Sequence, residues 1–260
     1  MVIIVSGASS GIGYECAKLF ASSGHKVYGL SRSGVSAQGV TGISVDVTDE
    51  AAVTAAVNRV FIAEERIDAL VNAAGMGISG ATECTSLKDA KYLFDVNFFG
   101  TFSLSKLVLP YMRAQTEGGR IINISSLAAV FSIPFQSFYS ASKAAINSLS
   151  AAIAAEVEPF NVHLTSIMPG DIKTGFTKNR VKIEPLPEYA ARVNRSVAVM
   201  EHDEQTGMPP RRIAEAALKV LNKKKPPLSV TVGAKYKLLR LLSKLLPESL
   251  AQIIIKGIYG

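Results

Sequence analysis

Short apolar runs alternate with longer helical patterns along most of the chain, and this alternation limits the possible folds more than any other feature. Runs typical of strands lie at residues 1–5, 26–30, 43–45, 68–71, 119–124, 162–167 and 228–232. Helical patterns lie between them, ending near residue 23 and then covering about 48–63, 87–96, 100–114, 137–157 and 209–221. Such alternation indicates βαβ units with right-handed crossovers. We expect one α/β domain over residues 1–260, a Rossmann-type doubly wound parallel sheet of about seven strands with helices on both faces.

One segment between the last predicted strands departs from this alternation. Residues 171–210 are rich in charges and proline and have no regular apolar pattern. A connection this long in a compact domain often serves as a lid or a substrate loop. We expect a substrate loop here, and the alternative is a solvated surface insertion.

The C-terminal residues 235–260 form a second unusual segment, which we expect to be an amphipathic extension. Its leucines occupy one helical stripe, and the basic residues Lys237, Arg240 and Lys244 lie off that stripe. The helix either packs on the fold or on a partner subunit, or it lies on an anionic membrane surface.

The net charge of the chain is concentrated near its C-terminus. Residues 211–260 carry a net charge of +9 and residues 1–210 a net charge of −2. A protein that binds nucleic acid through its main body would need a basic stripe there. We therefore expect no nucleic acid partner.

Cysteine usage and hydropathy predict the compartment. Cys16 and Cys84 provide neither a disulfide framework nor metal-ligand spacing, which favours a reducing compartment and no metal site. No apolar run approaches the ~18 residues that cross a bilayer. The N-terminus lacks the basic segment of a signal peptide. We expect a cytoplasmic protein, with peripheral membrane contact as an additional possibility.

A glycine cluster separates the first predicted strand from the first helix. Gly7, Gly11 and Gly13 lie in SGASSGIGYE, with the spacing G-x-x-x-G-x-G and not the G-x-G-x-x-G of many dinucleotide folds. A tight turn that leads into a helix N-terminus can present backbone N–H groups to a phosphate. The position of the cluster therefore favours a nucleotide site.

The end of the second strand predicts which nucleotide binds. An acidic residue there would suit the ribose hydroxyls of NAD, but the chain reads Leu30-Ser31-Arg32-Ser33. The planar guanidinium of Arg32 can pair with a ribose 2′-phosphate. We expect NADP(H) to be preferred over NAD(H), although a solvated loop arginine would have the same sequence.

Tyr139 and Lys143 stand four residues apart in QSFYSASKAA. On a helix they would share one face. A nearby cation favours a phenolate and lowers its pKa, which is the adjustment that proton transfer near neutral pH requires. Spacing alone does not distinguish a proton-transfer pair from two residues on an ordinary helix surface.

Six motifs together carry a family resemblance. They are SGASSGIG, NAAG at 72–75, Asn97 in DVNFFG, Ser126 in INISSLA, YSASK at 139–143 and PGDIKT at 169–174. In this order and spacing the chain resembles the short-chain dehydrogenase/reductase family over roughly residues 2–174. Two positions depart from the usual pattern: Ser6 replaces a threonine, and Ala73 replaces the second asparagine of Asn-Asn-Ala-Gly.

The resemblance implies four catalytic residues. Tyr139 would be the acid/base on the substrate oxygen, and Lys143 would lower the tyrosine pKa and hold the nicotinamide ribose. Ser126, thirteen residues before the tyrosine, would hydrogen-bond the substrate oxygen in preference to Ser125. Asn97 would support a water molecule in a proton relay.

The same matching implies the cofactor contacts. Ser10 and Arg32 would face the 2′-phosphate, and Asp46 and Val47 would contact the adenine. The remaining contacts would be Gly7, Ser9, Gly11, Ile12 and Gly13 at the pyrophosphate and adenosine side, Asn72, Ala73, Ala74 and Gly75 at the adenosine ribose, and Pro169, Gly170, Ile172 and Thr174 by the nicotinamide amide.

The expected function is an NADP(H)-dependent oxidoreductase that interconverts a carbonyl and an alcohol. Residues 138–170 resemble the hydroxysteroid- and retinol-dehydrogenase-like branch, which implies a bulky apolar substrate such as a steroid or retinoid. The alternatives are a 3-oxoacyl thioester reductase and a catalytically silent NADP(H)-binding protein. By resemblance we also expect a homodimer or homotetramer.

Overall fold

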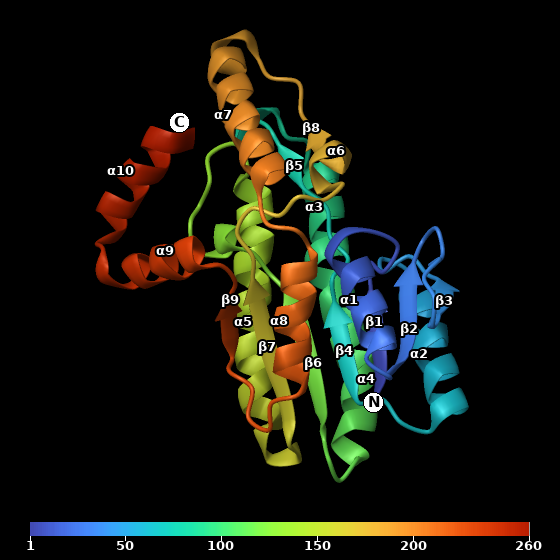
Figure 1. Ribbon diagram of the computed structural model, residues 1–260. Helices are drawn as coiled ribbons and strands as arrows, with labels where there is room; N and C mark the ends of the chain where they lie inside the picture. The colour runs from blue at the N-terminus through green and yellow to red at the C-terminus, as the bar shows by residue number, and fades with distance from the viewer. Residues whose placement is uncertain (260) are drawn as a thin grey trace.

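A seven-stranded parallel sheet forms the centre of the molecule (Figure 1). The computed structural model describes residues 1–259, apart from the side chain at position 248. The strand order is β3-β2-β1-β4-β6-β7-β9. The bounds are β1 Val2–Ser6, β2 Lys26–Ser31, β3 Val40–Ser44, β4 Ala69–Asn72, β6 Gly119–Ile124, β7 Val162–Met168 and β9 Ser229–Thr231. This arrangement confirms the predicted doubly wound fold.

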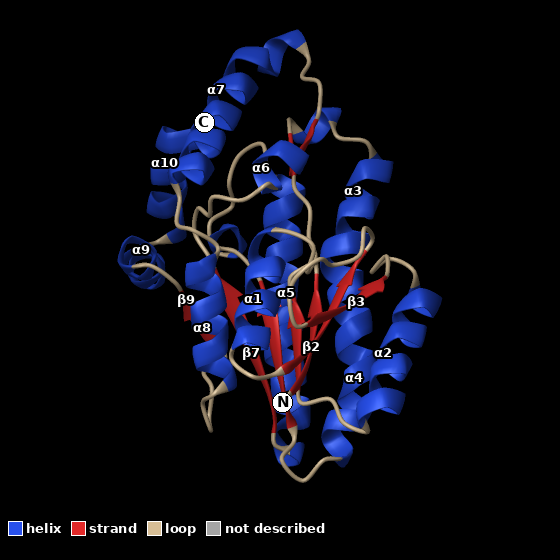
Figure 2. Ribbon diagram, turned by 45° about the vertical axis from the view of Figure 1, so that its right-hand side comes forward, coloured by secondary structure: helices blue, strands red, loops and turns tan. Residues whose placement is uncertain are grey.

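Helices cover both faces of the sheet (Figure 2). Helices α2, α4 and α5 pack on one face, and α1 and α8 pack on the other. The main helices are α1 Gly11–Ser22, α2 Glu50–Glu64, α3 Leu87–Phe94, α4 Gly100–Ala114, α5 Ser137–Val157 and α8 Arg211–Leu221. Asp49 caps α2 by accepting a hydrogen bond from the Ala52 N–H at 3.0 Å, as its position in the sequence predicts.

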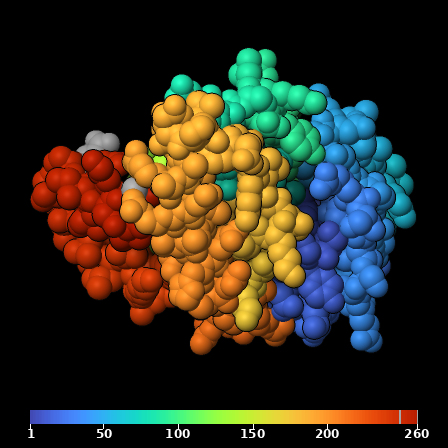
Figure 3. Space-filling view, turned by 90° about the horizontal axis from the view of Figure 1, so that it is seen from above, coloured from blue at the N-terminus to red at the C-terminus, as the bar shows by residue number. Residues whose placement is uncertain are grey.

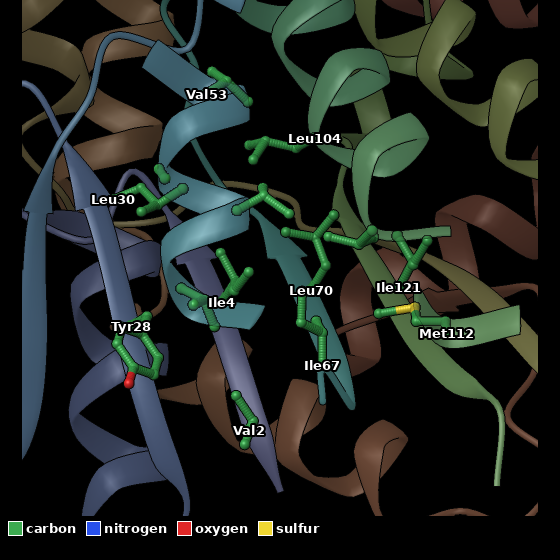
Figure 4. Close-up of a cluster of buried hydrophobic side chains, with 14 of the residues drawn as sticks. Val2, Ile4, Tyr28, Leu30, Val53, Ile67, Leu70, Leu104, Met112 and Ile121 are labelled. Carbon is green, nitrogen blue, oxygen red and sulfur yellow. The ribbon is translucent and has the colours of Figure 1, made fainter. Parts of the chain in front are cut away.

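Strand β1 shows why the central strands consist of unbroken apolar residues. Successive side chains of a strand point to opposite faces of the sheet. Val2 and Ile4 accordingly join the core under α2 and α4, which Figure 4 shows, while Ile3 and Val5 join the core under α1 and α8. Because both faces are covered by helices, both sets of side chains must be apolar.

The structure differs from the sequence-based expectation in two places. The third strand was expected at residues 43–45 and spans Val40–Ser44. It is an edge strand in which only Ile43 is fully buried, so its sequence lacks the apolar run of a central strand. Residues 171–210 were expected to be irregular, yet they contain the 20-residue helix α7 Pro187–Thr206.

Helix α7 is not evident from the apolar pattern of the sequence, because most of its surface is polar. Its buried side chains are Val193, Ser196, Val197 and Met200, a narrow i, i+3, i+4, i+7 stripe. The segment also holds the short helix α6 Phe176–Asn179 and the strand β8 Val181–Lys182. Strand β8 pairs with β5 Ile78–Ser79 in a separate two-stranded sheet that the sequence pattern did not predict.

The predicted amphipathic extension is a pair of helices. Helix α9 covers Ala234–Leu245 and α10 covers Glu248–Tyr259. Helix α10 packs beside α7, and helices α9 and α10 lie at one side of the molecule (Figures 1 and 3). We call residues 234–259 the C-terminal helix pair.

Candidate active site

A cavity of about 1080 Å³ opens at the carboxyl end of the sheet. Loops that follow β1, β2, β4, β6 and β7 form its floor, and α5, α7, α9 and α10 contribute to its walls. Ligands of open α/β sheets bind at this edge, next to the point where the strand order reverses. Here that point lies between β1 and β4.

The turn after β1 forms a narrow cradle. Gly7 has a φ of +65°, and a Cβ there would lie 2.7 Å from the Ala74 nitrogen. Helix α1 begins at Gly11, and its N-cap residue Ser10 makes no side-chain capping bond. First-turn N–H groups without a side-chain acceptor, together with the helix dipole, attract an anion. The cradle therefore fits the pyrophosphate of a dinucleotide.

Gly13 has a packing role and does not line the cavity. A Cβ at this position would overlap the Gly7 carbonyl. Its missing side chain lets α1 lie directly against the turn that forms the cradle. Gly13 thus supports the cofactor site from behind.

The far end of the cavity is built from Arg32, Asp46, Val47 and Tyr92. The Arg32 Nη1 donates to the Tyr92 hydroxyl at 3.3 Å, and the guanidinium is exposed to the cavity mouth. The Asp46 Oδ1 accepts from the Thr48 N–H and hydroxyl at 3.0 and 2.8 Å. Sequence reasoning missed Tyr92, because only the fold brings α3 to the end of β2.

Asn72 lies behind the cavity wall in a buried polar network. Its Nδ2 donates to Asn123 Oδ1 at 2.8 Å and to the Ser105 hydroxyl at 3.1 Å. This network joins β4, β6 and α4. Ala73, Ala74 and Gly75, which follow it, do line the cavity.

Helix α5 places Tyr139 and Lys143 in the middle of the cavity. The Tyr139 hydroxyl is hydrogen-bonded to the Ser126 side chain, so the predicted tyrosine–serine pair is brought together. Ser125 also reaches the cavity wall, but its hydroxyl donates to the Lys143 carbonyl at 3.2 Å. This geometry favours Ser126 over Ser125 for contact with a substrate oxygen.

Burial controls the protonation of both side chains. It raises the pKa of Tyr139 to about 12, although the hydrogen bond with Ser126 acts in the opposite direction. It also lowers the pKa of Lys143 to about 8. The tyrosine shift is opposite to the lowering that the resemblance implied, because desolvation by burial is its largest cause. The Lys143 ammonium lies 5.7 Å from the ring centroid and donates to the Ile124 carbonyl at 2.9 Å.

Asn97 lies directly behind the Tyr139–Lys143 region and is fully buried. Its Oδ1 accepts from the Met76 N–H at 2.8 Å, and its Nδ2 donates to the Met76 carbonyl at 3.0 Å and to the Ser142 hydroxyl at 3.1 Å. It belongs to the π-helical turn η2 Asp95–Phe99, a type of distortion found often at functional sites. Asn97 holds the backbone after Gly75 in place, and the predicted relay role stays a prediction.

Of the remaining predicted residues, those after β7 all line the cavity. They are Pro169, Gly170, Ile172 and Thr174. Ser9 and Ile12, from the turn after β1 and the start of α1, line the cavity as well. A Cβ on Gly11 would touch the Thr174 side chain at 3.5 Å. The two motifs, far apart in sequence, therefore adjoin each other at the cavity.

Beyond Tyr139 the cavity becomes apolar. Phe176 of α6 lies against the Tyr139 ring at a centroid distance of 5.6 Å. The wall then continues with Val199, Met200, Leu239, Leu242, Leu246, Ile254, Ile255 and Ile258. The sequence predicted a substrate loop at residues 171–210, which includes Val199 and Met200, but it did not single out any of these side chains, because they come from helices whose position depends on the tertiary fold.

A buried ion pair fixes α6 to α7 beside this apolar region. Arg180 pairs with Glu204, which also accepts a hydrogen bond from the Thr177 hydroxyl at 2.5 Å. The Arg180 guanidinium lies over the Phe176 ring, 5.6 Å from its centroid. The pair holds Phe176 in position next to Tyr139.

No helix among residues 1–259 is long and apolar enough to cross a membrane. Within the same residues, no group of three or more His, Cys, Asp or Glu side chains is arranged to hold a metal ion.

A dinucleotide cradle joined to a group of a buried lysine with a partly exposed tyrosine and serine defines an oxidoreductase of the Rossmann class. The family model of short chain dehydrogenases matches residues 1–184. The chain therefore belongs to the short-chain dehydrogenase/reductase family, whose members use NAD or NADP.

Comparison with individual proteins agrees with this family. The chain is 40% identical to a 3-ketodihydrosphingosine reductase of Bacteroides thetaiotaomicron over 100% of this chain and 98% of that protein. A short-chain dehydrogenase from Streptomyces avermitilis superposes with a TM-score of 0.84 at 31% identity, covering 94% of this chain and 92% of that one. A short chain dehydrogenase from Burkholderia cenocepacia in complex with NADP gives a TM-score of 0.74 at 26% identity, covering 92% and 91%.

Proposed function

We propose that this protein is an NADP(H)-dependent ketone reductase for a substrate with a long apolar chain. The observation that carries the proposal is the single cavity with two unlike ends. A glycine cradle that suits a dinucleotide forms one end, aliphatic side chains of α7, α9 and α10 form the other, and Tyr139 lies between them.

The residues around Tyr139 suit the reduction of a carbonyl group. NADPH bound in the cradle would supply the hydride to the carbonyl carbon. Tyr139, a protonated phenol at neutral pH, donates its proton to the carbonyl oxygen. Ser126 donates a hydrogen bond to the same oxygen. The Lys143 ammonium stabilises the phenolate that remains and holds the nicotinamide ribose hydroxyls.

Arg32 supports the preference for NADP(H). Its guanidinium is exposed beside Tyr92 at the adenosine end of the cavity, and no carboxylate follows β2 at positions 31–34. Replacing Arg32 by alanine is expected to raise the KM for NADPH roughly tenfold or more, because a charge-assisted hydrogen bond contributes about 1.5–3 kcal/mol. The KM for NADH should change little.

Steady-state kinetics with both cofactors tests this assignment. Arg59→Ala, which removes an exposed arginine of α2 away from the cavity, is the matched control and should leave both KM values unchanged. A wild-type protein that uses NADH more efficiently than NADPH would contradict the role given to Arg32.

The apolar end of the cavity supports a flexible aliphatic substrate. Its wall is mainly leucine, isoleucine, valine and methionine side chains. The 40% identical relative is named as a reductase of 3-ketodihydrosphingosine, a ketone on a long alkyl chain. We infer the same substrate class for this protein, in preference to the rigid steroid or retinoid skeleton and to a 3-oxoacyl thioester.

Oxidation of NADPH in the presence of a carbonyl panel tests the proposal. The panel contains a 3-keto sphingoid base, a keto steroid, retinal, a 3-oxoacyl thioester and a short water-soluble ketone. We expect the highest kcat/KM for the sphingoid ketone. A clear preference for the steroid, retinal or thioester would contradict the proposed substrate class. NADPH binding without any turnover would favour a catalytically silent NADP(H)-binding protein.

The proposal also covers the oligomeric state of the protein and its compartment. Members of this family usually associate through their long helices, and we propose a homodimer or homotetramer in the cytoplasm. Light scattering of the purified protein measures the mass, and a monomer at micromolar concentration would contradict the assembly.

A further inference from the structure

The C-terminal helix pair is fixed to the body of the molecule near both of its ends. The Tyr236 hydroxyl in the first turn of α9 donates to Asp171 Oδ2 at 2.8 Å, and the Tyr259 hydroxyl at the end of α10 donates to Asp203 Oδ2 at 3.4 Å. Ile255 is the most deeply buried side chain of α10, with an exposed fraction of 7%. These contacts define an inner and an outer side of the helix pair.

The inner side of the helix pair is part of the cavity wall. Leucines of α9 and isoleucines of α10 line the apolar end of the cavity. The leucine stripe predicted from sequence therefore has two parts. Leu239, Leu242 and Leu246 face the cavity, while the other three leucines face outward.

The outer side of the helix pair is a ridge of exposed apolar side chains, which we call the outer ridge. On α9 it consists of Leu238, Leu241 and Leu245, at i, i+3 and i+7, with exposed fractions of 58%, 54% and 71%. On α10 it continues with Leu250 and Ile253 at 47% and 65%. Large apolar side chains gathered on one surface usually mark a site of contact with a partner or a membrane.

Basic side chains border the outer ridge. Lys237 and Lys244 are exposed and lie four residues before and three residues after Leu241. On a helix they therefore flank that leucine. Lys256 is exposed and stands three residues after Ile253 on α10. Residues 234–259 contain five Lys or Arg and one Glu, so this surface carries a positive charge.

An anionic lipid surface is the partner that matches this pattern. An apolar ridge bordered by lysines inserts among acyl chains while its ammonium groups meet lipid phosphates. A second copy of the chain fits less well. A two-fold contact places the same surface of both copies face to face, so the lysines that border the outer ridge would be brought against an equally positive surface of the other copy.

We propose that the outer ridge is a membrane-docking surface for anionic bilayers. The helix pair lies in the lipid interface and does not cross the bilayer, in agreement with the absence of a spanning helix among residues 1–259. The same two helices then separate the bilayer from the apolar end of the cavity. Docking itself depends on neither the cofactor nor the substrate assigned above.

Co-sedimentation of the full chain with vesicles tests docking without a measurement of activity. Wild-type protein is expected to bind vesicles of phosphatidylglycerol and phosphatidylcholine, and to bind pure phosphatidylcholine at least tenfold more weakly. The double substitution Leu241→Asp/Leu245→Asp should reduce binding to the mixed vesicles at least tenfold. Lys237→Glu/Lys244→Glu should do the same without removing an apolar side chain.

The matched control introduces the same charge on another face. Ile62→Asp on α2 replaces an isoleucine that is 79% exposed and should leave vesicle binding unchanged. Thermal unfolding midpoints equal to that of the wild type establish that each variant is folded. Absence of wild-type binding to anionic vesicles, or equal binding by all variants, overturns the proposal. Loss of a dimer in the ridge variants without any lipid binding assigns the ridge to a subunit contact and also overturns it.

Discussion

Replacing Tyr139 by phenylalanine is expected to lower kcat for ketone reduction roughly 10²–10⁴-fold, the contribution of a positioned general acid. The phenyl ring keeps its contact with Phe176, 5.6 Å away between centroids, so the wall of the cavity should keep its shape. NADPH affinity should be nearly unchanged, because the cradle around Gly7 and Gly11 is not altered.

Single-turnover rates and cofactor fluorescence titration separate the two quantities. Tyr111→Phe on α4 is the matched control, because it removes a tyrosine hydroxyl from an exposed contact with Asn58 of α2. It should reduce neither quantity. A Tyr139→Phe protein that retains more than about one tenth of the wild-type kcat would show that another group donates the proton.

Replacing Lys143 by methionine is expected to cost roughly 10²–10³ in kcat, as does the loss of a buried electrostatic stabiliser. Burial lowers the pKa of the Lys143 ammonium to about 8, so the wild-type side chain loses its charge as the pH rises through about 8. Reduction needs the charged form, because the ammonium stabilises the phenolate. Wild-type kcat/KM should therefore be constant below about pH 7 and fall above pH 8.

The pH profile distinguishes this role from a purely structural one. The Lys143→Met profile should lack the fall near pH 8 and should be low throughout. Lys106→Met, which removes an exposed lysine paired with Glu50, should reproduce the wild-type profile. An unchanged fall near pH 8 in the Lys143 variant would assign that titration to another group.

The parallel sheet could be predicted from sequence because its central strands are buried on both faces. Ile3, Ile4 and Val5 leave little alternative to a central strand, and the strong Asp49 cap marks the start of α2. The edge strand β3 and helix α7 were described wrongly, because each buries only a few side chains. In such elements tertiary contacts, and not local pattern, decide the structure.

The cofactor cradle and the residues around Tyr139, which form the polar half of the site, could be predicted from sequence about as well as the central strands. Motifs fixed by backbone geometry, such as the Gly7 turn, keep their residue types and positions. For the apolar half, the sequence predicted only that residues 171–210 form a substrate loop. The individual side chains Phe176, Met200 and Ile255 could not be named, because they reach the cavity from elements whose placement is not encoded locally. Tyr92 was missed for the same reason. The direction of the Tyr139 pKa shift depends on burial, which spacing in the sequence does not report.

The π-helical turn at Asp95–Phe99 joins α3 to α4 in one continuous helical run. Each residue advances an α-helix by about 100°, so the wide turn determines which side of α4 faces the sheet. Leu104, Val108 and Met112 are now directed into the core. Deleting one residue of the turn would let a regular helix run from α3 into α4 and would displace Asn97 from the Met76 backbone that it holds. Substitutions at the exposed Phe99 should therefore be tolerated far better than the loss of a residue or a change at the buried Asn97.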